Sequence, residues 1–377
     1  RMMKKGAALQ GGMPKYKFVG NKILSWFENK ILRTNFTEFH SGYRLYSVKA
    51  LKKIPFQLNT NDFHFDSEII VQFVIAELKI KELEIPTYYG DEICHVDGLK
   101  YAWDVTKTVL KARAQELSIF YDRRFDCQPN GNDSAHYEPK LDFLSPHSLA
   151  IKIVGKDKRV LDLGCANGHI AKTLTKQGNQ VTGVDTFKPS ANIRFQKFIK
   201  HDLNSNVFPV ELKGYDYVLM LDVIEHLLTP EEFVDQLRKA AQMSPNVRLL
   251  VSSGNVGFIV ARLMHMVGQF NYGKRGILDI THTRLFTFAT LRRLFEQGGF
   301  ELISTTGIPA PFPMVMGKSY LGAFLFNFNK VLIRIWRSAF SYQIFYEFRP
   351  SPSLSYLLQD ALVKSKIRSA KKTASKT

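Results

Sequence analysis

The chain combines the length of two domains with a strong excess of positive charge. It has 377 residues, of which 45% are hydrophobic and 12% aromatic, and a formal net charge of +18 at pH 7. The length predicts two domains with substantial cores, and the charge favours anionic partners: phosphorylated substrates, anionic lipid headgroups or nucleic acid. Three cysteines without close spacing argue against a disulfide framework and against a zinc site, so we predict no bound metal and a reducing, cytoplasmic compartment.

Residues 1–125 alternate apolar runs with basic and aromatic residues. The stretch "GGMPKYKFVGNKILSWFENKIL" has a helix-capable pattern. In "EFHSGYRLYS" (38–47) an acid and a histidine stand two residues apart, and Arg44 follows His40 by four. Such a cluster can bind a metal-diphosphate or activate a phosphate acceptor, or it can be a charged loop at the start of a packed helix.

A polar stretch separates this region from a regular alternation of strands and helices. Residues 126–143 are rich in Pro, Gly, Asn and Asp, which predicts a linker. Beyond it, helices are predicted at 169–178, 230–241 and 287–299, and strands at 159–164, 180–185, within 195–203, and at 215–223, 247–254, 300–307 and 340–348. Strands spaced by helices indicate a doubly wound parallel sheet in a domain spanning 144–349, to which 340–348 can add an antiparallel strand.

Two segments near the C-terminus bear on membrane contact. No apolar run reaches the roughly 18 uncharged residues of a membrane span. The segment 320–336 is interrupted by Lys330 and Arg334, so it is either a core helix or an interfacial one. Residues 350–377 end in "KSKIRSAKKTASKT", which has no acid and predicts a disordered basic tail, either for solubility or for anionic lipid.

The stretch "VLDLGCANGHIAKTL" (160–174) joins a predicted strand to a predicted helix through a glycine loop. Gly164 and Gly168 permit a close ligand approach that a side chain would block. The loop lacks the G-x-G-x-x-G pattern of a dinucleotide site and the Gly-Lys-Ser/Thr of a Walker loop. Asp162, two residues before Gly164, suits a cationic amino-acid group better than a diphosphate.

Acids also end the next two predicted strands. Asp185 can accept hydrogen bonds from both ribose hydroxyls, and Asp202 can accept one from an adenine amino group. Alternatively, each of these acids caps a helix or a turn. Three acids in this order at one sheet edge favour a nucleoside ligand.

Residues 158–310 resemble the class I S-adenosylmethionine-dependent methyltransferases. The resemblance rests on "VLDLGCANG", "GVD", "HDL" and "VLMLDVIEHL" (218–227), and it implies a Rossmann-like seven-stranded sheet with S-adenosylmethionine as cofactor. The segment "GILDITHTRLFTFATLRRLFEQGGF" is similar to O-methyltransferases of sugars, lipids and quinones. The donor-binding positions implied are Asp162, Gly164, Cys165, Ala166, Gly168, Asp185, Asp202, Leu203, Leu221 and Asp222.

A hydroxyl acceptor would need a base near the methyl donor. The candidates are Glu225, His226 and His282, and Arg284 is a candidate contact for an anionic substrate. Each of these can instead pack locally or fasten its loop to the sheet. Methylation of nucleic acid is disfavoured, because the sequence has neither an N-P-P-Y or D-P-P-Y run nor a separate recognition module.

Residues 1–125 resemble the C-terminal half of family-two glycosyltransferases of the polyprenyl-phosphate (dolichyl-phosphate-mannose) type, which have a GT-A α/β fold. The acceptor-side motif of that family is matched at Glu38, His40, Ser41 and Arg44, and "FHFDSEII" and "EIPTYYGDE" match later segments. The nucleotide-binding half and its D-x-D motif have no counterpart in residues 1–125. We therefore expect a fragment that does not transfer sugar.

These patterns together predict an O-methyltransferase for a small molecule, sugar or lipid-linked glycan in cell-envelope biosynthesis. It would work in the cytoplasm, at the membrane face if it contacts anionic lipid. The alternatives are a glycosyltransferase, if the natural protein has the missing half, and a non-catalytic membrane-associated scaffold. The sequence does not specify the oligomeric state.

Overall fold

The chain divides into two compact units. The first is Arg1–His136 with Asn271–Lys274, and the second is Tyr137–Phe270 with Arg275–Thr377. The computed structural model describes residues 2–4, 6–86, 88–90, 96–116, 121–127, 142–189, 193, 195–313 and 319–374, with the backbone alone for 365–374. The boundary falls in the predicted linker, of which residues 128–141 lie outside the described part.

The first unit is built around two long helices that pack together, α2 (Lys15–Leu32) and α5 (Gly98–Glu116). A small apolar core forms where Val105 and Val109 of α5 meet Val71 and Phe125. The helix predicted from "GGMPKYKFVGNKILSWFENKIL" is confirmed as α2. The remaining helices of this unit are α1 (Ala7–Gln10), α3 (Val48–Leu51), η1 (Phe56–Leu58), α4 (Phe65–Ile75) and η2 (Arg123–Phe125).

The predicted α/β character of residues 1–125 is not seen, because the described residues of the first unit contain helices and loops but no strand. A strand requires a partner strand for its backbone groups. In this unit a side chain satisfies such a backbone group in place of a strand. The Glu82 carboxylate accepts hydrogen bonds from the amide (2.9 Å) and the hydroxyl (2.6 Å) of Thr37. Parts of "EIPTYYGDE" lie outside the described residues.

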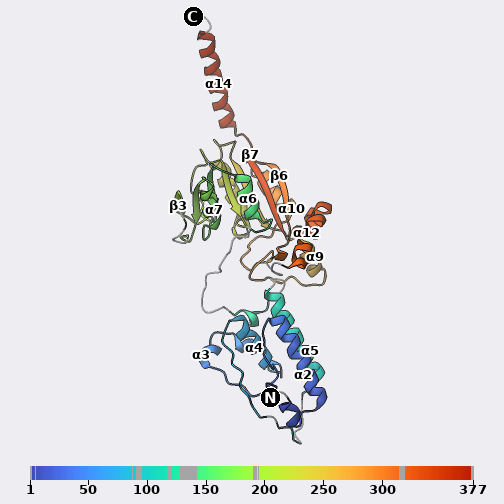
Figure 1. The fold of residues 1–377 in the computed structure, drawn as a ribbon. Helices are drawn as coiled ribbons and strands as arrows, with labels where there is room; N and C mark the ends of the chain where they lie inside the picture. The colour runs from blue at the N-terminus through green and yellow to red at the C-terminus, as the bar shows by residue number, and fades with distance from the viewer. Residues whose placement is uncertain are drawn as a thin grey trace. The chain divides into compact units, whose positions relative to one another are not determined.

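The second unit contains a seven-stranded sheet in the order β3-β2-β1-β4-β5-β7-β6 (Figure 1). The strands β1 to β5 run parallel, and β7 pairs antiparallel with both β5 and β6. The predicted doubly wound sheet and its antiparallel last strand are confirmed. The strands are β1 (Arg159–Leu163), β2 (Gln180–Asp185), β3 (Lys197–Lys200), β4 (Tyr217–Leu221), β5 (Arg248–Gly254), β6 (Phe300–Ile308) and β7 (Gln343–Pro350).

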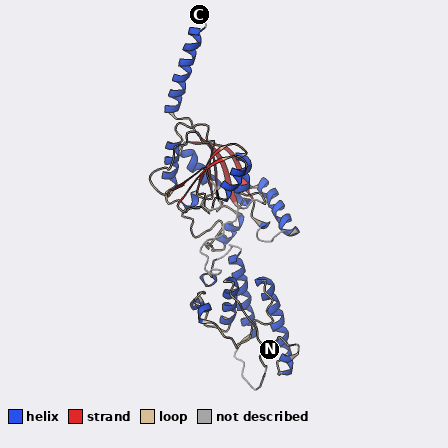
Figure 2. Ribbon diagram, turned by 60° about the vertical axis from the view of Figure 1, so that its left-hand side comes forward, coloured by secondary structure: helices blue, strands red, loops and turns tan. Residues whose placement is uncertain are grey.

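Helices cover both faces of this sheet, whose strands run through the middle of the unit (Figure 2). Alternate residues of β1 point to opposite faces: Val160 packs with α6 and α7, whereas Leu161 and Leu163 pack with α8 and α10. The helices and turns of this unit are α6 (Pro146–Val154), α7 (His169–Lys176), η3 (Ile224–His226), α8 (Pro230–Ala240), α9 (Ile259–Met266), α10 (Phe288–Gln297), α12 (Tyr320–Ile335), α13 (Arg337–Phe340) and α14 (Leu354–Ala374).

The C-terminal segment differs from its prediction. Where a disordered tail was predicted at 350–377, α14 is helical. Its Ala, Leu, Lys and Arg residues have high helix propensity, and the Ser353 hydroxyl accepts a hydrogen bond from the Tyr356 amide at 3.1 Å, which caps the first turn. No helix in the described part of the chain is long and apolar enough to cross a membrane.

Candidate active site at the carboxyl edge of the sheet

The glycine loop turns at the carboxyl end of β1 and leads into α7. Gly164 has φ +69° and Gly168 has φ +76°, both in the left-handed region that favours glycine. A Cβ added at Gly164 would lie 2.6 Å from a methyl carbon of Val223, and one at Gly168 would lie 2.8 Å from the ring of Phe195. Both positions therefore require glycine, because any other residue would be strained in this backbone conformation and its Cβ would clash with a neighbouring side chain.

Asp162 is buried at the base of this loop, with 2% of its surface exposed. Its Oδ2 has no hydrogen-bond partner among the described residues. Burial, reinforced by the charge of Asp185, raises the pKa of Asp162 to about 7. An unsatisfied carboxyl oxygen beside a glycine loop suits a cationic ligand group, because an ammonium would supply both the missing hydrogen bond and the counter-charge.

The other two predicted acids lie at the ends of neighbouring strands. Asp185 ends β2, and its Oδ2 accepts a hydrogen bond from the Ala166 amide of the glycine loop at 2.8 Å. Asp202 follows β3, is exposed, and caps the Asn204 amide at 2.9 Å, while the adjacent Leu203 is half-buried against the core. Both acids make turn contacts of the kind expected if they were only structural.

Asp222 joins three strands at this edge. Its Oδ1 accepts a hydrogen bond from the Ser252 hydroxyl of β5 and its Oδ2 accepts one from the Gln343 amide of β7, each at 2.7 Å. Asp222 itself has φ +57°, whereas Leu221 is buried in the sheet. Sequence reasoning missed Ser252 and Gln343. The only sequence signal for Ser252 was the presence of two serines, Ser252 and Ser253, inside a buried strand.

Glu225 is buried just beyond β4. One carboxyl oxygen accepts a hydrogen bond from the Gly254 amide at 3.2 Å, and the Ser253 hydroxyl of β5 also interacts with this carboxylate. Burial, together with the nearby charge of Asp222, raises the pKa of Glu225. Its backbone carbonyl accepts a hydrogen bond from the Thr283 amide at 2.9 Å, so this residue also fastens the 279–284 segment to the sheet.

The two candidate histidines lie against each other, with ring centroids 4.7 Å apart. His226 is exposed, and its Nδ1 contacts both oxygens of Thr281 at 3.2 Å. Nδ1 of His282 donates a hydrogen bond to the Ile277 carbonyl at 2.9 Å. Burial lowers the pKa of His282, so its ring is neutral at pH 7 and the lone pair lies on Nε2. His282 therefore has the protonation state of a base.

Arg284 is held at the start of α8. Its guanidinium contacts the carboxylate of Glu231 at 3.1 Å and 3.4 Å, and both side chains are about half exposed. An anionic substrate would have to compete with Glu231 for this cation. The contact predicted for Arg284 remains a prediction.

The predicted acceptor-side residues of the first unit are tied into its framework. Nδ2 of Asn21 donates to Glu38 at 3.3 Å. The Arg44 guanidinium donates to the carbonyls of Ser41 (2.8 Å) and Asp66 (2.7 Å), and also to that of Phe39. Arg44 therefore fixes the conformation of its own loop.

His40 belongs to a buried network that the sequence did not reveal. Its Nε2 lies 3.0 Å from the carboxylate of Glu28, and its Nδ1 lies 3.0 Å from the Tyr101 hydroxyl. Burial raises the pKa of Glu28, and the contact with His40 only partly opposes this. Glu28 was missed because it sits inside an ordinary helical pattern.

One group of side chains in the first unit has metal-ligand spacing. Ligand atoms of Asp62, His64 and Asp104 lie within 4.8 Å of one another. Lys100 already contacts Asp62 at 3.1 Å and supplies positive charge there. We assign no metal to this group. Cys127 and Cys165 are buried free thiols, and Cys94 lies outside the described residues.

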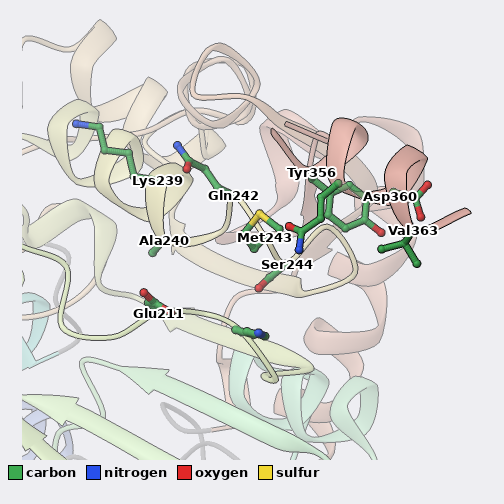
Figure 3. Close-up of a pocket in the computed structure, with 11 residues that line it drawn as sticks. Glu211, Lys239, Ala240, Gln242, Met243, Ser244, Tyr356, Asp360 and Val363 are labelled. Carbon is green, nitrogen blue, oxygen red and sulfur yellow. The ribbon is translucent and has the colours of Figure 1, made fainter. Parts of the chain in front are cut away.

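A cavity of about 590 Å³ in the second unit lies away from this edge (Figure 3). It is lined by the end of α8, by Met243 and Ser244 ahead of β5, and by Tyr356 and Asp360 of α14. These residues mark the amino end of β5. Ligands of open α/β sheets bind at the carboxyl ends, so we do not associate this cavity with the glycine loop.

A family model described as a methyltransferase domain matches residues 134–305. Residues 134–305 are a methyltransferase domain. S-adenosylmethionine is the methyl donor of this enzyme. The residues at the sheet edge fit that donor, because Asp162 offers an unsatisfied buried oxygen for the ammonium group.

Curated relatives are similar to the methyltransferase domain at low identity. The chain is 28% identical over 207 residues to a ubiquinone biosynthesis O-methyltransferase of Coxiella burnetii, covering 52% of this chain and 85% of the relative. It is 32% identical over 103 residues to the enzyme of that name from Rickettsia typhi, covering 26% of this chain and 41% of the relative.

Solved structures also align with part of the chain. A S-adenosylmethionine-dependent methyltransferase from Archaeoglobus fulgidus aligns with a TM-score of 0.38 and 16% identity, over 54% of this chain and 90% of the other. The 1,6-didemethyltoxoflavin-N1-methyltransferase of Burkholderia thailandensis aligns with a TM-score of 0.36 and 15% identity, over 55% and 76%.

Proposed function

We propose that the methyltransferase domain methylates a hydroxyl oxygen of a small molecule, a sugar or a lipid-linked glycan, with His282 as the general base. The names of the Coxiella and Rickettsia relatives support an oxygen acceptor. The observation that carries the proposal is the hydrogen bond from His282 Nδ1 to the Ile277 carbonyl, which directs the basic nitrogen away from the backbone.

The donor side would be formed by the glycine loop and the three acids. Asp162 would hold the ammonium group, Asp185 the ribose hydroxyls, and Asp202 with Leu203 the adenine. Ala166 and Cys165 would line the loop, and Leu221 with Asp222 would close the site. These assignments follow the strand ends at which the side chains lie.

A bound donor would supply an electrophilic methyl group, with its carbon–sulfur bond broken as the carbon–oxygen bond to the acceptor is made. The acceptor hydroxyl must lose its proton as this bond forms. In our proposal that proton passes to Nε2 of His282. Burial keeps the ring neutral beforehand, and Glu225 holds the His282 segment in place through its carbonyl.

The first experiment seeks the acceptor. The full chain is incubated with methyl-labelled S-adenosylmethionine and fractionated membrane-lipid and lipid-linked sugar extracts, and mass spectrometry locates the added methyl group. A methyl ether in one fraction supports the proposal, whereas a methyl ester would show a carboxylate acceptor and contradict it. A methyl group on nitrogen or carbon, or no transfer to any fraction by protein that binds the donor, contradicts it.

Substitution of His282 tests the base. In His282→Asn the side-chain amide can still donate to the Ile277 carbonyl, but the base is lost, so we expect kcat to fall by about 10²- to 10⁴-fold. The donor dissociation constant should be unchanged by calorimetry. The wild-type rate should fall as the pH drops below the pKa of His282, and this acid limb should be absent in the variant.

His265→Asn is the matched control, because it makes the same change at an exposed histidine on α9. Normal kcat in His282→Asn would refute the assigned base. If His226→Asn alone abolished turnover, the base would be His226.

The glycosyltransferase alternative rests on resemblance at Glu38, His40, Ser41 and Arg44. Arg44 donates to backbone carbonyls of its own unit, which favours a structural role. We therefore expect this chain to leave sugar nucleotides intact. Sugar-nucleotide hydrolysis by the purified chain, followed by chromatography, would contradict that expectation.

A further inference from the structure

The helix α12 presents an apolar face to solvent on the side opposite its packing contacts. Its buried residues are Gly322, Phe326 and Asn329. The residues at 320, 324, 328, 331 and 335 recur at helical spacing and share the opposite face. Their exposed fractions are 98% for Tyr320, 64% for Phe324, 50% for Phe328, 52% for Val331 and 75% for Ile335. A surface helix ordinarily carries polar residues there.

The shorter helix α9 repeats this arrangement. Val260, Leu263 and Met266 are exposed at helical spacing, and Val267 continues the stripe. A cation–π contact links α9 to the end of α12, because the Arg262 guanidinium lies 5.4 Å from the centre of the ring of Trp336, the residue after α12. We call the exposed apolar residues of the two helices the α9–α12 surface: Val260, Leu263, Met266, Val267, Tyr320, Leu321, Phe324, Phe328, Val331, Ile335 and Trp336.

The charged side chains within the two segments that form this surface are all positive. Residues 256–270 and 319–341 contain no Asp or Glu, but they contain Arg262, Lys330, Arg334 and Arg337. Lys330 and Arg334, one helical turn apart, flank the apolar stripe of α12. Aromatic residues favoured at a membrane–water interface, Tyr320 and Trp336, stand at the two ends of the same helix.

We propose that the α9–α12 surface docks the protein onto an anionic lipid bilayer. Apolar side chains would enter the headgroup region, and the flanking cations would contact lipid phosphates. The 16 residues of α12 span about 24 Å, short of the roughly 30 Å hydrocarbon core, so the helix lies along the interface.

The docking surface is attached to the acceptor side of the sheet. Phe258, at the start of α9, packs on Tyr342 with ring centroids 5.7 Å apart, and Tyr342 directly precedes the Gln343 that binds Asp222. A membrane-dissolved amphiphile is therefore the acceptor class that this arrangement serves. This second step rests on the proposed function, whereas bilayer docking does not.

Vesicle sedimentation of the full chain tests the docking. Vesicles of phosphatidylcholine alone and vesicles with about 30% phosphatidylglycerol are compared at low and high salt. We expect the anionic vesicles to bind the protein at least tenfold more tightly, with most of that difference lost at high salt.

Two double variants locate the surface. Lys330→Glu with Arg334→Glu should weaken binding to anionic vesicles about tenfold or more. Phe324→Ser with Phe328→Ser should weaken it at both salt concentrations, because apolar insertion is not screened. The matched controls are Lys172→Glu with Lys176→Glu on α7, and Val19→Ser with Ile23→Ser on α2, at the same four-residue spacing.

The proposal fails if either control pair weakens binding as much as its α12 counterpart, or if wild-type protein ignores anionic vesicles. It also fails if light scattering shows that the wild type is a dimer and that the double variant Phe324→Ser with Phe328→Ser is a monomer. The α9–α12 surface would then be an interface between two copies of this chain. Calorimetry with S-adenosylmethionine should give the same affinity for every variant, which separates failure of docking from failure of the proposed methyl transfer and shows that the second unit is folded in the α7 and α12 variants.

Discussion

At the scale of single residues, two buried carboxyl groups distinguish the site from an ordinary sheet edge. Both side chains are buried, one oxygen of Asp162 has no hydrogen-bond partner among the described residues, and burial raises the pKa of Asp162 and of Glu225. A buried acid without a partner destabilises a fold unless it is protonated. Both side chains therefore link protonation to stability and ligand binding.

The raised pKa of Asp162 predicts how the free energy of unfolding depends on pH. Its folded pKa of about 7 lies above its unfolded value near 4, so the folded state binds more protons between these limits. Its contribution to stability is present below pH 4 and is lost as the pH rises through 7, at up to about 1.4 kcal/mol per pH unit. Urea unfolding of Asp162→Asn should show a shallower decline across this window than wild type.

The control for this prediction is Asp235→Asn, at an exposed position of α8, which should leave the decline unchanged. Addition of S-adenosylmethionine supplies a second readout. If its ammonium group pairs with Asp162, binding near pH 7 should release a proton from the wild type and none from Asp162→Asn, as measured by calorimetry in buffers of different ionisation enthalpy. Identical proton release would refute the pairing.

At the scale of elements, local pattern predicted most of the fold. Apolar runs located all seven strands, because burial imposes a pattern on each strand separately. Local pattern could not predict that Asp222 binds Gln343, 121 residues away. The sequence pattern of the exposed face of α12 was also indistinguishable from that of a core face, since an apolar stripe does not show whether another element covers it.

The glycine loop gives a prediction at this scale, because it packs against the segment after β4. Gly164→Ala introduces a left-handed alanine and a Cβ 2.6 Å from Val223. Gly268→Ala introduces the left-handed alanine alone, because no atom lies within 4 Å of its Cβ position. We expect Gly164→Ala to lose about 1–3 kcal/mol more in the free energy of unfolding.

Donor affinity should fall in Gly164→Ala and stay normal in Gly268→Ala, as measured by calorimetry. Equal destabilisation by the two substitutions would mean that the close approach of the glycine loop to Val223 does not affect stability.

At the scale of the whole molecule, the division into two units predicts two unfolding transitions in calorimetry. S-adenosylmethionine binds the second unit, so at 100 times its dissociation constant it should stabilise that unit by about 2.7 kcal/mol. The transition of the first unit should not move. A single transition that shifts as a whole would show instead that the units unfold cooperatively.

The antiparallel course of β7 has an evolutionary consequence. Since β7 runs against its neighbours, its first residue lies at the carboxyl ends of the parallel strands, and the connection from β6 to β7 carries α12 and α13 to the same edge. This one insertion, residues 309–342, can diverge or be exchanged while the strands that hold the donor stay fixed. If the acceptor reaches the site along this segment, as we propose, variation within it would alter acceptor delivery without rebuilding the strands at the donor side.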